Sequence, residues 1–309
     1  RSVLPGTVLE WALYSRLYAR DHLEQVLLSY GLILVFEELR SLIVGNDVHD
    51  DGSDPLADGH GGIEVHSGSD LIFEGNAFHA LTGLDTDPAD GLAILVDSVN
   101  NVTVSCNRFE SSENGLSVVG GSSTVSILHN RFAGLSGTAV TVAADSGSGT
   151  LVNQCVFQGN ATAVSYAGPA PLDAQQCWWG AADGPAPLGT GDPVSGNVDT
   201  SGFYPRATAP LLVRAPHNDG WSYPLAACYA AVQDAVNAAN PGDLILIGDG
   251  KYLEHVLVDG KALDFEGAAN GWRVVGNDLS CPNGTGLSGC IVGGDGTTPD
   301  NLKLYGNVV

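Results

Sequence analysis

The feature that most constrains the fold of this chain is a short pattern that recurs between residues 45 and 179. Each instance is a strand-like burst followed by Asn, one variable residue and Phe, Val or Trp, and two later instances carry Cys in place of Asn. These positions are Asn46, Asn76, Asn107, Asn130, Cys155 and Cys177, with spacings of 30, 31, 23, 25 and 22 residues. A recurrence in this range indicates a repeat architecture, in which each unit buries its apolar face against its neighbours.

Each repeat holds two further apolar bursts, one behind a glycine or small residue and one just before the Asn. The first kind occupies 62–65, 91–96, 115–119, 138–142 and 161–166, and the second kind 71–73, 102–104, 124–128 and 150–152. Apolar residues alternate in the bursts with a period of two, which is typical of half-buried strands. Short strands at this period predict a coil that stacks on itself, with parallel strands about 4.8 Å apart.

The recurrent residues have predicted places in such a coil. The aromatic residues Phe78, Phe109, Phe132 and Phe157 are expected to stack inside as a ladder. The Asn is expected at a tight turn, where it tolerates a left-handed backbone and hydrogen-bonds its counterparts in neighbouring coils. The two longer spacings require inserted loops, at 50–61 and 81–90. Such insertions tend to cluster on one face of a solenoid, often its binding face.

The Asn and Phe positions together resemble the right-handed parallel β-helix proteins of the pectin-lyase-like fold. The segment 176–180 (Gln-Cys-Trp-Trp-Gly), with Asp183-Gly184-Pro185 after it, is similar to the Asn-x-Trp-Trp-Gly … Gly-Pro ending of many bacterial repeat proteins of this type. The resemblance covers residues 41–205 and implies an all-β, right-handed parallel β-helix. Such a fold does not by itself give a function.

A second signal begins at residue 224. Residues 228–239 have helical apolar spacing, Pro241-Gly242-Asp243 ends the helix, and the strand-like segment 244–247 follows. With Gly250, Tyr252 and Glu254 after it, this order resembles the N-terminal capping helix and first coil of a pectinesterase-like β-helix. Residues 224–309 are therefore expected to be the start of a second, truncated β-helix, and residues 206–223 a linker.

Residues 1–40 fit neither pattern and are expected to be helical. Residues 8–45 resemble a stretch of the permeases of branched-chain amino-acid ABC transporters. The apolar run 25–36 is too short to span a bilayer, so no membrane span is expected. Two interpretations stay open: an amphipathic helix that caps the first coil, or a foreign fragment joined to the solenoid. The absence of Met and a C-terminus that stops within a repeat favour a fragment of a longer chain.

Composition restricts the partners. The chain has 35 acidic and 12 basic residues, a formal net charge of −23, which argues against nucleic-acid binding because phosphates need cationic side chains. Six cysteines are too few for a disulfide scaffold at this length. For Cys281 and Cys290 two states stay open, a disulfide formed outside the cell or free thiols. We expect an extracellular or cell-surface protein.

The densest polar segment is the first inserted loop with the residues just before it, 47–61. Oxygen-rich loops suit Ca²⁺, and the candidate ligands are Asp47, Asp50, Asp51, Asp54 and Asp58. Paired carboxylates also suit glycosidic hydrolysis, for which Asp50, Asp51 and His60 are the catalytic candidates. The segments 50–51 and 59–61 are similar to motifs of polygalacturonase-like hydrolases, and 47–50 to the Asp-Pro-His of mannuronan epimerases. A solvated acidic loop is the alternative, and the Arg-x-Lys expected of the hydrolases is missing.

Three further residues are candidates for substrate binding. Arg108 and Arg131 occupy equivalent positions beside the Asn ladder, so they are expected to stack on one solvent-facing side, where they can contact an anionic sugar. Trp178 is a candidate sugar-stacking platform, with closure of the core as the alternative. His66, His79 and His129 are expected to be structural. The second inserted segment, Asp85 to Asp90, can supply further carboxylates near the first.

These features favour an extracellular or cell-surface β-helix repeat protein with a carbohydrate-binding or polysaccharide-related role and no complete catalytic site. Ca²⁺ is a possible cofactor, and a polysaccharide or cell-surface glycan is the expected partner. Three alternatives stay open. They are a lyase, hydrolase or epimerase acting on uronic-acid polymers, a structural or adhesion array, and a chimeric fragment carrying part of a permease.

Overall fold

The computed structural model describes residues 42–49, 61–82, 91–215, 225–248, 261–267, 273–275 and 303–305, together with residues 252, 256 and 258. The chain divides into two units, residues 1–42 and 43–309, and the second contains the repeats. The predictions for residues 1–40 lie outside the described residues, as do those for Cys281 and Cys290.

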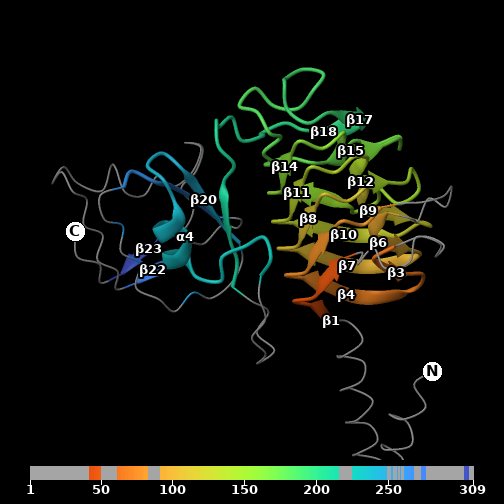
Figure 1. Ribbon diagram of the computed structural model, residues 1–309, viewed down its shortest axis with the longest axis horizontal. Helices are drawn as coiled ribbons and strands as arrows, with labels where there is room; N and C mark the ends of the chain where they lie inside the picture. The colour runs from red at the N-terminus through yellow and green to blue at the C-terminus, as the bar shows by residue number, and fades with distance from the viewer. Residues whose placement is uncertain are drawn as a thin grey trace, which may run out of the picture. The chain divides into compact units, whose positions relative to one another are not determined.

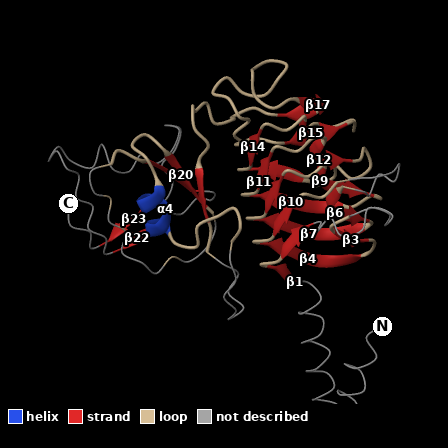
Figure 2. Ribbon diagram, in the orientation of Figure 1, coloured by secondary structure: helices blue, strands red, loops and turns tan. Residues whose placement is uncertain are grey.

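The repeats form three parallel sheets that run along the solenoid (Figures 1 and 2). The first sheet contains β1 (Leu42–Val44), β4 (Gly68–Glu74), β7 (Val99–Ser105), β10 (Ser123–Leu128), β13 (Leu151–Asn153), β16 (Leu172–Asp173) and β18 (Val198–Asp199). The second contains β2 (Asp47–His49), β5 (Ala77–His79), β8 (Arg108–Glu110), β11 (Arg131–Ala133) and β14 (Val156–Gln158). The third contains β3 (Ile63–Val65), β6 (Leu92–Asp97), β9 (Asn114–Val119), β12 (Thr138–Val142), β15 (Thr162–Tyr166) and β17 (Val194–Gly196).

Each strand pairs in parallel with the equivalent strand of the next coil. Val102 of β7, for example, lies opposite Leu71 on one side and Val125 on the other. A sheet that continues this way needs a chain that returns to the same place once per coil, which is what the repeated bursts predict. The predicted parallel β-helix is confirmed.

The core of the solenoid holds the predicted aromatic ladder. Successive ring centroids from Phe78 through Phe109, Phe132 and Phe157 to Trp179 are 5.0, 4.5, 5.2 and 4.8 Å apart. All five side chains are completely buried. The ladder is confirmed, and its spacing follows the separation of parallel strands, because one ring comes from each coil.

The Asn ladder is confirmed at the turn between the first and second sheets. Asn107 shows the pattern, since its amide Nδ2 donates to Asn130 Oδ1 at 3.0 Å and to the Phe73 carbonyl at 2.8 Å. Its Oδ1 accepts from the backbone N–H of Asn76 at 2.9 Å. Cys177 takes over this role in part, because its Sγ accepts from Cys155 N at 3.4 Å and donates to the Val152 carbonyl at 3.2 Å. Sulfur is a weaker hydrogen-bonding group than an amide, so this end of the ladder is held less tightly.

The C-terminal part contains α4 (Val232–Ala238) and a parallel sheet of β19 (Leu211–Val213), β20 (Leu244–Ile247) and β21 (Asp264–Gly267). A further parallel pair joins β22 (Arg273–Val275) and β23 (Lys303–Tyr305). The predicted helix and the strand 244–247 are confirmed, although the helix is shorter than 228–239. The linker prediction is wrong for residues 211–213, because this apolar triplet pairs with β20. The predicted boundary of a second β-helix at 224 stays a prediction.

Candidate functional site

The outer face of the second sheet carries two rows of side chains, which we call the outer rows. The first row consists of Asp47, Ala77, Arg108, Arg131 and Val156, which are in register on successive coils. The second row consists of His49, His79, Glu110, Ala133 and Gln158. The alternation of strand side chains puts these rows outside because the residue between them belongs to the aromatic ladder. The predicted stacking of the two arginines is confirmed.

The first two coils of the outer rows form a linked polar group. His79 Nε2 lies 2.9 Å from Asp47 Oδ1, and the rings of His49 and His79 stack with centroids 4.9 Å apart. The Asp47 side chain is 66% exposed, so the group faces solvent rather than filling the core. His79, expected to be structural, therefore lies on the candidate face.

The third and fourth coils carry the two arginines. Arg108 Nε lies 3.7 Å from Glu110 Oε2, which is long for an ion pair, and Arg131 Nη2 donates to the neutral Gln158 Oε1 at 2.8 Å. Like charges directly opposite each other in a sheet repel. The positive charges of Arg108 and Arg131 are therefore only partly neutralised by their neighbours. A carboxylate or sulfate bound between the two arginines would relieve their mutual repulsion.

The other residues of the predicted acidic site lie outside the described residues. These are the catalytic candidates Asp50, Asp51 and His60 and the metal candidates Asp54 and Asp58. Both inserted segments leave the solenoid just after the second sheet, since Asp50 follows β2 directly and residue 83 comes four positions after β5. Within the described ranges, no group of three or more His, Cys, Asp or Glu side chains is arranged so that it could hold a metal ion. Asp47 is the one candidate ligand that the structure describes.

Trp178 does not lie on the exposed face. Its side chain is 3% exposed and packs with Tyr204, Leu212, Leu244 and Leu246, and its Nε1 donates to the Arg206 carbonyl at 2.9 Å. Trp178 therefore closes a core, which was the alternative to a sugar-stacking platform. In this arrangement the C-terminal part covers its ring, so a sugar cannot reach it.

A second polar cluster on the surface was missed from the sequence. His66 lies between Glu64 and Asp97, with Nε2 2.9 Å from Glu64 Oε2 and Nδ1 3.2 Å from Asp97 Oδ2. The hydrogen bond to Asp97, and then that to Glu64, raise the pKa of His66 above its ordinary value. The two-residue spacing of Glu64 and His66 was visible, but the approach of Asp97 depends on the coil register.

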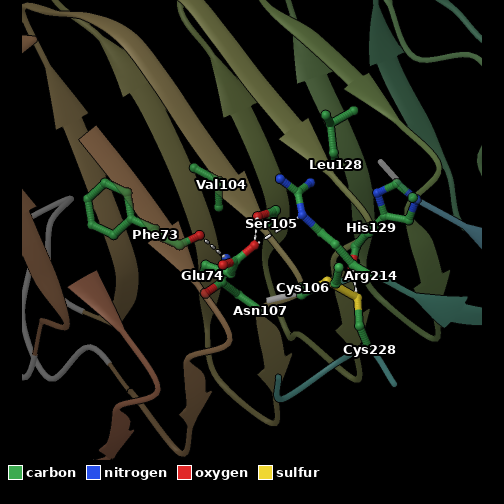
Figure 3. Close-up of polar contacts among 12 residues, drawn as sticks. Phe73, Glu74, Val104, Ser105, Cys106, Asn107, Leu128, His129, Arg214 and Cys228 are labelled. Atoms are coloured by element: carbon green, nitrogen blue, oxygen red, sulfur yellow. Dashed lines mark hydrogen bonds and ion pairs between the residues drawn. A yellow bond between two sulfur atoms is a disulfide. The ribbon is translucent and has the colours of Figure 1, made fainter. Parts of the chain in front are cut away.

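The structure also joins the C-terminal part to the solenoid. Cys106 and Cys228 form a disulfide across 122 residues, and Arg214 Nε lies 3.0 Å from Glu74 Oε1 (Figure 3). No spacing in the sequence pointed to this pairing, because Cys106 was assigned to the turn of one coil and Cys228 to a separate helix.

Comparison with known proteins gives one match. The family model described as a right handed beta helix region matches residues 28–176. Neither a curated protein nor a solved structure matches the chain. The family match and the parallel sheets together show that the repeat region is a right-handed parallel β-helix. Among the described helices, none is long and apolar enough to cross a membrane.

Proposed function

We propose that this β-helix protein works outside the cell or at its surface and binds an anionic glycan along the outer rows of the second sheet. The observation that carries the proposal is the adjacent placement of Arg108 and Arg131 on an exposed sheet face. The chain has only 12 basic residues and a net charge of −23, so two neighbouring cations are a local exception. An arginine guanidinium suits carboxylates and sulfates because it can donate two parallel hydrogen bonds.

The other outer-row residues support a sugar ligand in particular. Asp47, His49, His79, Glu110 and Gln158 supply acceptors and donors at every coil but one. Successive coils present them at intervals of about 4.8 Å along the solenoid. A polymer that repeats hydroxyl and carboxylate groups along its length can use such a row several times, and the contacts then add as in any multivalent ligand.

The location is supported by the Cys106–Cys228 disulfide, because such bonds persist in oxidising surroundings and are rare where glutathione keeps thiols reduced. Asp47 and the acidic segment after it remain the place where we expect Ca²⁺. A strongly negative protein repels polyuronates, and a bridging cation would offset that repulsion.

The test is a binding and cleavage panel of neutral, uronic-acid and sulfated oligosaccharides, with and without Ca²⁺. We expect binding to the anionic members and not to the neutral ones, weakened by added salt because the contacts are charged and exposed. Cleavage that is lost in Asp51→Ala would instead favour the enzyme alternative. Absence of binding to every member would overturn the proposal and favour a structural array.

A further inference from the structure

The contact between the solenoid and the C-terminal part is built at the turn that carries the Asn ladder. We call residues 206–215 and 225–248 the docked segment. Its Ala227 N–H donates to the Cys106 carbonyl at 2.9 Å, and the neighbouring Cys228 closes the disulfide with Cys106. The segment is therefore fixed to one coil by a covalent bond, drawn in Figure 3, and by the backbone hydrogen bond of the neighbouring residue.

An apolar cluster extends this contact over the end of the second sheet. The solenoid contributes Val156, Trp178 and Tyr204, and the docked segment contributes Leu212, Leu244 and Leu246. Val156 is the next member of the first outer row after Arg131. The docked segment therefore covers the continuation of the candidate binding face.

A buried ion pair lies beside the disulfide. Glu74 is 1% exposed and pairs with Arg214 of the docked segment, while Ser105 Oγ donates to the same carboxylate at 3.1 Å. A carboxylate buried in this way is costly when its partner leaves. The Glu74–Arg214 ion pair therefore stabilises the docked arrangement, provided that no further charged group is buried beside it.

His129 is the titratable group at this contact. It is 1% exposed, and neither ring nitrogen has a hydrogen-bond partner among the residues that the structure describes. Figure 3 shows it beside Arg214 and near the disulfide. Gly248 lies against its ring, since a Cβ at residue 248 would be 3.0 Å from His129 Cε1. Burial, and then the charge of Arg214, lower the pKa of His129 to about 3. Among the described residues, the charged groups around it are Arg214 and, through Arg214, Glu74. A proton on His129 would therefore add a second cation to a site with one carboxylate.

We propose that docking of this segment on the solenoid is acid-sensitive, with His129 as the sensor and the Cys106–Cys228 disulfide as a crosslink that stays closed in both the docked and the undocked state. Docked, His129 must be neutral. Undocked, it lies on a solvent-facing turn and titrates near its ordinary value of about 6.5. Below that pH the undocked state binds one more proton, so the docking equilibrium weakens by about tenfold per pH unit.

Undocking would expose Val156 and Trp178, which follow Arg131 on the next two coils. The exposed part of the first outer row would then be longer and would end in an aromatic residue. The importance of this consequence for ligand binding rests on the proposed function. The acid sensitivity itself does not, because it concerns two parts of the same chain and can be measured without any ligand.

The experiment is hydrogen exchange with mass spectrometry on the full chain with the disulfide intact, followed between about pH 7.5 and about pH 5 and corrected for intrinsic exchange. We expect peptides from 206–215 and 225–248 to lose protection by about tenfold per pH unit below about pH 6.5. Peptides from β6 to β12 should keep theirs. A docked segment whose protection is unchanged down to about pH 5 would overturn the proposal.

The matched variant is His129→Gln, because the chain itself places Gln154 and Gln176 at the equivalent left-handed turn position of later coils. The pH dependence should disappear in this variant and persist in His66→Gln, which removes an exposed histidine far along the chain. If His129→Gln does not fold, His129→Asn replaces it, since Asn also adopts left-handed backbone. A pH dependence that survives the loss of His129 would assign it to other groups and refute the sensor role.

Discussion

The two faces of the second sheet are built from the same strands and follow opposite rules. The inner face repeats one kind of side chain, from Phe78 through Phe109 to Trp179, at nearly constant spacing. The outer face varies along the solenoid, from Asp47 to Arg108 to Val156. A stacked coil must bury the same shape in each turn, whereas solvent imposes no such limit. The inner face therefore fixes the fold, and the outer face is free to carry specificity.

The largest effect should come from breaking the inner ladder. Phe109→Ala removes a ring that stacks on Phe78 and Phe132, and we expect it to lower the free energy of unfolding by about 3–5 kcal/mol. Chemical denaturation followed by circular dichroism measures this. Arg108→Ala, one residue away on the outer face, should change stability by less than about 0.5 kcal/mol. Equal losses in the two variants would contradict the division between the faces.

A smaller effect should follow from exchanging the two kinds of ladder residue. Asn107→Cys copies the arrangement of Cys155 and Cys177 in the middle of the Asn ladder. It replaces amide hydrogen bonds to Asn130 and Phe73 with weaker sulfur contacts, so we expect a loss of about 1–3 kcal/mol. The same denaturation experiment applies. An unchanged midpoint would mean that the amide bonds add little beyond the aromatic stacking.

The smallest effect concerns the exposed cluster around His66. Its raised pKa means that the folded state holds the proton more tightly than the unfolded state. This contribution to stability is present below about pH 6.5 and is lost as pH rises through the folded-state pKa. An NMR titration should place the His66 midpoint above that of a free histidine, and Asp97→Asn should bring it back. A midpoint below the ordinary value would show that the two carboxylates do not hold the ring.

The difference between the faces also explains what the sequence could predict. The aromatic and Asn ladders were visible because Phe109 and Asn107 recur at coil spacing, and the places of Arg108 and Arg131 followed from them. The links of Cys228 to Cys106 and of Arg214 to Glu74 join segments that share no repeat. Core closure at Trp178 was one of two alternatives in the sequence, but the residues that cover its ring come from 206–246 and could not be identified from the repeat.

The most direct test of glycan binding along the outer rows is calorimetric titration of a uronic-acid oligosaccharide into the wild type and into Arg108→Ala/Arg131→Ala. We predict that affinity falls by at least about tenfold in the double variant, because each charged hydrogen bond contributes about 1.5–3 kcal/mol, while the denaturation midpoint stays unchanged. The affinity of Arg131→Lys should lie between those of the wild type and the double variant, since lysine keeps the charge but loses the guanidinium fork. Equal affinity of wild type and double variant would contradict the assignment of binding to the outer rows.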